Sequence, residues 1–351
     1  MGLLLWVAFR DASLAEVMQH LGSAGPALVL VLIPSCLAQL ADTRACQLLL
    51  SRLQCRLKFS RVFMAQAASE AATLGLPMGF LIGESLRPWL LSRGQQTTLE
   101  RCIAAVAGRK SLLILTEGLV IAFTLWLGYD IARGLSAGRL GGPLLILVSL
   151  GMVALLMAVA LLVPALLRSG RFADSLFGGL LRILPRRLRP LLEQKRRAFS
   201  RTDTELVRMF RVPLPQLLGP GLLYLAVWLL EGCELWLILR LLGADLPLEA
   251  ALLTEALVAT LRSLLPLLPA GIGIQDAGYV TLFAALGLPS ASSLGATFCL
   301  IKRSREGLWC LIGAGCFLVA RTKPELELRD DPCSSALHPG PEHTRPLPSG
   351  S

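Results

Sequence analysis

Four long apolar segments constrain the fold of this chain more than any other feature of its sequence. They cover residues 24–50, 111–128, 141–167 and 214–242, and each is long enough to cross a bilayer as a helix. Hydrophobic residues make up 54% of the chain and charged residues 17%, whereas water-soluble domains carry about 25% charged residues. The sequence therefore predicts an all-α, polytopic integral membrane protein and excludes a soluble globular one.

The first apolar stretch, residues 1–9, is shorter than these segments. It is too short to cross a bilayer unless it continues to about residue 21, past Arg10, Asp11 and Glu16. It is either a truncated first helix or a signal peptide. No basic residue precedes the apolar run and no clear small-x-small cleavage site follows it, which favours the truncated helix.

Positive charge is concentrated in residues 168–213, where Arg and Lys far outnumber Asp and Glu. By the positive-inside rule this segment and the basic loop at residues 52–61 are cytoplasmic, and the loop at residues 244–249 lies outside. Residues 172–184 form either an amphipathic helix on the inner leaflet or a solvated linker. The net charge of +10 reflects such cytoplasmic loops, so we expect no nucleic-acid partner.

A short motif occurs twice in the chain. Pro77-x-Gly79-x-x-Ile82-x-Glu84 and Pro269-x-Gly271-x-x-Ile274-x-Asp276 both spell Pro-x-Gly-x-x-Ile-x-carboxylate, each between two apolar runs. Proline and glycine break helices, and broken backbone persists at membrane depth only where protein or a watery cavity covers it. Such paired interruptions point to the substrate site of a transporter. The alternative is a pair of kinked spans or tight turns at the interface.

Several ionisable residues lie in apolar surroundings. Glu231 and Glu234 share one helix face, as do Glu255 and Arg262. Because an unpaired charge at the bilayer centre costs about 3 kcal/mol or more, these residues either form interhelical ion pairs or mark a substrate path.

Two basic positions carry more specific expectations. Arg87 follows Glu84 by one turn, and an arginine after a broken helix suits a phosphate-like head group. The charged run at residues 302–306, which contains Arg305, is either a cytoplasmic turn between two short helices or a basic wall of the cavity.

The chain offers little material for catalysis. It has three histidines and nine cysteines, with no Cys-x-x-Cys pair and no histidine in a clear span, so we expect no enzymatic activity, no metal site and no disulfide framework. No Gly-x4-Gly-Lys-Ser/Thr loop for ATP occurs. We expect no cofactor.

Motifs in the last third of the chain resemble a known family. The run Glu255-Ala-Leu-x4-Arg262, then 268–276, Gly287-Leu288 and Arg303-x-Arg305-Glu306-x-x-Trp309 resembles the transmembrane domain of lysylphosphatidylglycerol synthases and related flippase-like membrane proteins. The pattern Gly83-Glu84-x-x-Arg87 is similar to that of hopanoid-biosynthesis-associated members.

The resemblance implies broken or re-entrant helices and movement of a lipid between leaflets. Two features depart from it: Asp276 stands where many members have glutamate, and the first helix is short. In the synthases an aminoacyl-transferase domain follows the membrane region, whereas residues 322–351 here are too few and too rich in proline for one, so we do not expect aminoacylation of lipid.

The sequence thus predicts two related membrane halves, residues 1–167 and 214–321, with helix breaks near 77–91 and 266–287. The basic segment 168–213 separates them, and a disordered tail, 322–351, follows. The expected function is flippase-like translocation of a hopanoid or other polar-headed lipid in the bacterial inner membrane. The alternative is a non-transporting scaffold that presents lipid to a biosynthetic enzyme. The expected substrate-binding residues are Gly83, Glu84, Arg87, Glu231, Arg262, Pro269, Gly271, Gly273, Asp276 and Arg305.

Overall fold

The regular elements of the described residues are all helices. The computed structural model describes residues 12–76, 79–93, 97–138, 144–168, 189–264 and 273–322. The expected first helix at residues 1–9, the amphipathic segment 172–184 and residues 323–351 of the tail lie outside these ranges.

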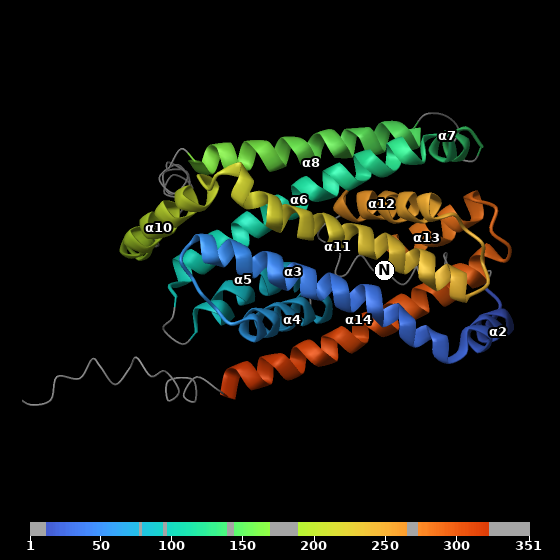
Figure 1. Cartoon of the computed structure of the whole chain (residues 1–351), viewed down its shortest axis with the longest axis horizontal. Helices are drawn as coiled ribbons and strands as arrows, with labels where there is room; N and C mark the ends of the chain where they lie inside the picture. The colour runs from blue at the N-terminus through green and yellow to red at the C-terminus, as the bar shows by residue number, and fades with distance from the viewer. Residues whose placement is uncertain are drawn as a thin grey trace, which may run out of the picture.

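Long helices form most of the molecule and run along its long axis (Figure 1). They are α3 (Leu32–Arg52), α6 (Leu99–Leu127), α8 (Leu144–Arg168), α11 (Leu214–Leu241) and α14 (Ala291–Thr322). α2 (Leu14–Ala24) and η1 (Gly25–Val31) lead into α3. Among the described residues, four segments are long and apolar enough to cross a membrane: Leu14–Arg52, Leu99–Leu127, Leu144–Arg168 and Leu214–Leu241. The prediction of an all-α membrane protein with several apolar helices is confirmed.

One span begins earlier than the hydropathy of the sequence predicts. The apolar segment begins at residue 111, but α6 begins at Leu99, where the hydroxyl of Thr98 accepts a hydrogen bond from the backbone N–H of Arg101 at 3.5 Å. Ala104, Ala105 and Gly108 are buried on this first part of the helix. Small residues let neighbouring helices approach closely, so packing extends the helix through Arg109 and Lys110.

Two pairs of shorter helices lie between the long ones. The first pair is α4 (Phe59–Gly75) and α5 (Gly79–Ser92), and the second is α12 (Leu248–Leu264) and α13 (Ile274–Ala285). None exceeds 17 residues, whereas a transmembrane helix needs about 20. Figure 1 shows α4 and α5 toward the end of the molecule where α10 (Arg189–Phe210) lies, and α12 and α13 toward the opposite end, near α2 and α7 (Tyr129–Gly138).

The repeated motif falls at the junction within each pair. Pro77, Pro269 and Gly271 lie outside the described residues. α5 begins at Gly79, and Gly273 precedes α13 with a φ of 89°. That left-handed conformation favours glycine because it has no Cβ.

Two hydrophobic cores fill the interior. One gathers residues such as Ile121, Ile238 and Phe283, and the other gathers Leu49, Leu91 and Met209. Each core draws side chains from both predicted membrane halves. Many leucines on α8 instead face outward, with exposed fractions of about 60% at Leu147, Leu161 and Leu162, as expected for a helix that contacts lipid.

Candidate functional site

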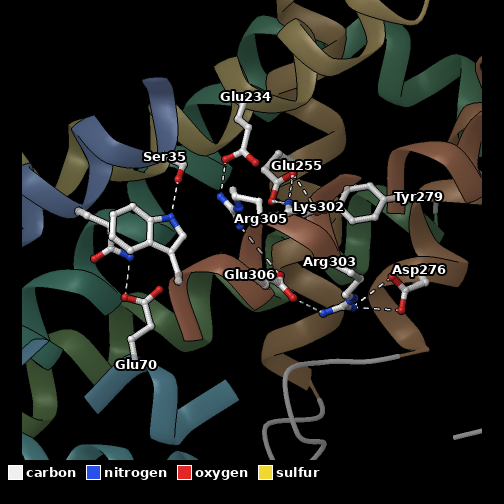
Figure 2. A network of polar contacts seen from close by, with 12 residues as sticks. Ser35, Glu70, Glu234, Glu255, Asp276, Tyr279, Lys302, Arg303, Arg305 and Glu306 are labelled. Atoms are coloured by element: carbon white, nitrogen blue, oxygen red, sulfur yellow. Dashed lines mark hydrogen bonds and ion pairs between the residues drawn. The ribbon is translucent and has the colours of Figure 1, made fainter. Parts of the chain in front are cut away.

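Three cations in the middle of α14 each bind a carboxylate from a different helix. Lys302 pairs with Glu255 on α12, Arg303 with Asp276 on α13, and Arg305 with Glu234 on α11 (Figure 2). Successive residues of an α-helix point about 100° apart, so neighbouring side chains on α14 reach different partners. α14 is a continuous helix through residues 302–306, which excludes the interpretation of this run as a turn between two short helices.

The Lys302 pair is the most buried part of this α14 network. Its Nζ lies 3.0 and 3.1 Å from the two carboxylate oxygens of Glu255, which is 4% exposed. Tyr279 on α13 donates its hydroxyl to the same carboxylate at 2.8 Å, and its ring packs edge-on against Phe298 at a centroid distance of 4.7 Å. Removing these groups from water is costly unless they bind each other, so the triad joins α12, α13 and α14.

Asp276 has two functions at the start of α13. One oxygen accepts a hydrogen bond from the backbone N–H of Gly273 at 2.8 Å, which satisfies a donor that has no partner within the helix at its N-terminus. Both oxygens also accept from Nη2 of Arg303, at 3.1 and 3.0 Å. Arg303 bonds Glu306 through its other terminal nitrogen at 2.7 Å, so its guanidinium bridges two carboxylates.

The network continues from Arg305 toward α3 and α4. Arg305 pairs with Glu234, and its Nη2 lies 4.0 Å from Glu306. Among the described residues, Glu234 Oε1 and Arg305 Nε are buried without a hydrogen-bond partner. Nearby, Gln39 on α3 donates to Glu70 on α4 at 2.5 Å.

A second buried cluster surrounds Asp42 on α3. Arg109 on α6 donates to both of its oxygens, Nε at 2.8 Å and Nη2 at 2.5 Å. Arg87 on α5 places Nη1 4.0 Å from Asp42 Oδ2 and donates Nε to Ser69 Oγ at 3.3 Å. All three charged groups are less than 10% exposed. Beside this Asp42 cluster, Lys110 pairs with Glu84 at 3.1 Å.

A third group of polar residues lies between α6, α11 and α12. Ser263 donates to Glu117 at 2.7 Å, and the guanidinium of Arg262 lies 5.5 Å from the ring centroid of Trp228. Arg262 also lies within electrostatic range of Glu231. Glu255 and Arg262, which share a helix face, therefore do not bind each other.

The structure distributes the expected site residues over these three groups. Asp276 and Arg305 belong to the α14 network, Glu84 and Arg87 to the Asp42 cluster and its neighbour, and Glu231 and Arg262 to the third group. Gly83 lies where α5 crosses α4 closely: a side chain there would clash with Thr73 and with the carbonyl of Ser69. Pro269 and Gly271 lie outside the described residues.

Sequence reasoning missed several residues of these groups. Asp42 lies near the end of one apolar run and Arg109 just before another, so each looks like an interfacial charge. Glu117 lies within an apolar run, where its ionisable carboxyl is the signal that could have found it. No group of His, Cys, Asp and Glu in the described ranges could hold a metal ion.

These features define a polytopic α-helical membrane protein with a charged interior. The chain belongs to the family described as the lysylphosphatidylglycerol synthase TM region, which matches residues 1–301. It is also similar to a UPF0104 membrane protein of Methanothermobacter thermautotrophicus, with 23% identity over 220 residues. That match covers 61% of this chain and 62% of the relative. No solved structure matches the chain. The family links the chain to lipid handling in the membrane.

Proposed function

We propose that this protein translocates a polar-headed lipid across the bacterial inner membrane, and that it acts as a transporter without catalysis. The observation that carries the proposal is the α14 network, in which Lys302, Arg303 and Arg305 bind carboxylates of three other helices. Ionisable groups inside membrane proteins are costly and often mark substrate paths. The family's link to lipid handling supports a lipid as the substrate.

In this proposal the lipid head group displaces internal carboxylates from the cations that bind them, while the acyl or isoprenoid tail stays in the surrounding lipid. Arg303 and Arg305 each have a carboxylate partner on another helix that a head group could replace. The short pairs α4–α5 and α12–α13 act as half-membrane hairpins that open the interior from opposite ends. The resemblance of Gly83-Glu84-x-x-Arg87 to hopanoid-associated proteins makes hopanoids one substrate class to test.

The test is lipid movement in vesicles that contain the purified protein. We expect wild type to move a labelled polar-headed lipid between leaflets, and Asp276→Asn and Arg87→Ala to reduce the rate by about tenfold or more, since each loses a charge-assisted contact. Arg240→Gln is the matched control, because Arg240 and its partner Asp245 are exposed. Equal rates for wild type and empty vesicles would reject the proposal.

The same variants can be tested in cells that lack the protein. We expect one lipid class to accumulate in the inner membrane, with wild type restoring the distribution and Asp276→Asn combined with Arg87→Ala failing to restore it at normal expression. An unchanged distribution with reduced total synthesis would instead support a scaffold.

The scaffold remains a second candidate because of α10. This helix carries exposed Arg201 and Arg208 and lies at one end of the molecule (Figure 1). Arg168 at the end of α8 donates to the carbonyl of Phe210, which fastens α10 to the membrane helices. Such a basic surface suits anionic lipid or an acidic enzyme. If docking is the task, Arg201→Gln with Arg208→Gln abolishes function in cells while Asp276→Asn does not.

A further inference from the structure

Two donors in the interior near Asp42 have no hydrogen-bond acceptor among the described residues. They are Nη1 of Arg87 and the hydroxyl of Tyr224 on α11. Arg87 is 6% exposed and Tyr224 is fully buried. An unsatisfied buried polar group costs about 1–3 kcal/mol, and each such group in a native protein calls for a specific explanation.

The surroundings of these donors favour an anionic ligand. Arg109 already occupies both oxygens of Asp42, so Arg87 remains at 4.0 Å from the same carboxylate. Glu84 is paired with Lys110, and Glu70 accepts from Gln39. Tyr224 lies within electrostatic range of Asp42, Arg109 and Arg87. Two guanidinium groups thus share one carboxylate, with a phenol close by.

We propose that Arg87, Arg109 and Tyr224 form a binding site for a phosphate group, with Asp42 as the counter-ion when the site is empty. Phosphate presents several strong acceptor oxygens in different directions, and arginine binds it in a bidentate way. Arg87 Nη1 and the hydroxyl of Tyr224 supply two of the donors, and Arg109 supplies more when Asp42 moves away. The inference rests on the proposed function, because it specifies the head group that the protein moves.

The position of the site favours a lipid as the source of the phosphate. Arg87, Arg109 and Tyr224 are each less than 10% exposed, and Arg109 is ten residues from the first residue of α6, about 15 Å along the helix axis. A lipid can bring its head group to that position while its tail stays in hydrocarbon. Inorganic phosphate offers the same acceptor oxygens as a lipid phosphate, so the experiment includes both.

The experiment follows thermal unfolding of the purified full chain in a neutral detergent. The additives are phosphatidic acid, diacylglycerol with the same acyl chains, and inorganic phosphate. We expect phosphatidic acid to raise the unfolding temperature in a saturable way and diacylglycerol to leave it unchanged. If inorganic phosphate stabilises the protein equally at equal concentration, the phosphate site stands and the lipid source is wrong.

The variants are Tyr224→Phe and Arg87→Gln, with Tyr129→Phe and Arg44→Gln as exposed controls. We expect each variant in the site to weaken phosphatidic acid binding about tenfold and the controls to bind like wild type. Without additive, Tyr224→Phe should unfold at the same temperature as wild type or a higher one, because the hydroxyl that it removes makes no hydrogen bond within the described residues. A lower temperature without additive, together with unchanged affinity, would show that the hydroxyl is structural and would overturn the site.

Failure of the site and failure of the proposed function are distinguishable. If phosphatidic acid binds with Tyr224-dependent affinity but no lipid crosses vesicles, the site stands and transport is rejected. If labelled lipid moves between the leaflets of the vesicles but phosphatidic acid and diacylglycerol bind the protein equally, transport stands and the phosphate site is rejected.

Discussion

Lys302 on α14 and Glu255 on α12 form a buried ion pair at 3.0 Å in the interior of the helix bundle. Tyr279 completes it: its hydroxyl lies 2.5 Å from Lys302 Nζ and 2.8 Å from Glu255 Oε2. A buried pair contributes little net stability, but losing one partner leaves a buried charge. The pair therefore makes the position of α14 depend on α12 and α13.

Removing only the cation should be strongly destabilising. We expect Lys302→Met to reduce the free energy of unfolding by about 3–5 kcal/mol, because Glu255 is left charged and unpaired. Adding Glu255→Gln should recover most of this loss, since the amide carbonyl still accepts from Tyr279. Denaturant or thermal unfolding in detergent measures both effects.

The matched control for this pair is Arg240→Gln, which removes an exposed ion pair with Asp245. Exposed pairs contribute about 0–1 kcal/mol, so the control should unfold close to wild type. If the double variant were no more stable than Lys302→Met alone, the pairing of Lys302 with Glu255 would be wrong.

Close packing between α14 and α4 predicts a different response at two glycines of one helix. A side chain at Gly313 would clash with the carbonyl of Ala67 and the methyl of Ala71, whereas Gly315 faces open space. We expect Gly313→Ala to cost about 1–3 kcal/mol of unfolding free energy. Gly315→Ala should be neutral or stabilising by up to about 1 kcal/mol, because alanine favours helix. Equal stability of the two variants would contradict the packing of α14 on α4.

The planar guanidinium of Arg305 should contribute to lipid movement in addition to its positive charge. Its guanidinium faces both Glu234 and Glu306, and a lysine ammonium cannot reproduce that planar geometry. We expect Arg305→Lys to fold normally but to move lipid about tenfold more slowly in vesicles, the effect of one charge-assisted hydrogen bond. Arg240→Lys serves as the control, and a full rate for Arg305→Lys would exclude a specific function for the guanidinium.

The two ends of the molecule should lie on opposite sides of the membrane. Arg56 lies in the exposed turn between α3 and α4, and Glu249 lies at the exposed start of α12. We expect a cysteine at position 249 to react with an impermeant maleimide in intact cells, and one at position 56 to react only after the membrane is opened. The native cysteines supply the background, which is measured on the unsubstituted chain. Labelling of both positions in intact cells would contradict the orientation.

The sequence alone determined the class of this protein. Long apolar runs are stable in lipid as transmembrane helices, because each helix satisfies its own backbone hydrogen bonds where no water is present. The positions of α3, α8 and α11 follow from hydropathy to within a few residues, except where η1 replaces the start of an expected span. Charge within apolar surroundings also marked Glu234, Glu255 and Asp276 as interior residues.

Only the tertiary structure decided which charges meet. Glu255 and Arg262 share a helix face, yet Glu255 binds Lys302 and Arg262 stacks on Trp228. Helical spacing places side chains on one face but does not say which helix covers that face. Asp42 and Arg109 are far apart in the chain and look interfacial, and they meet because α3 packs against α6. Local sequence determines helices, whereas pairing depends on long-range packing.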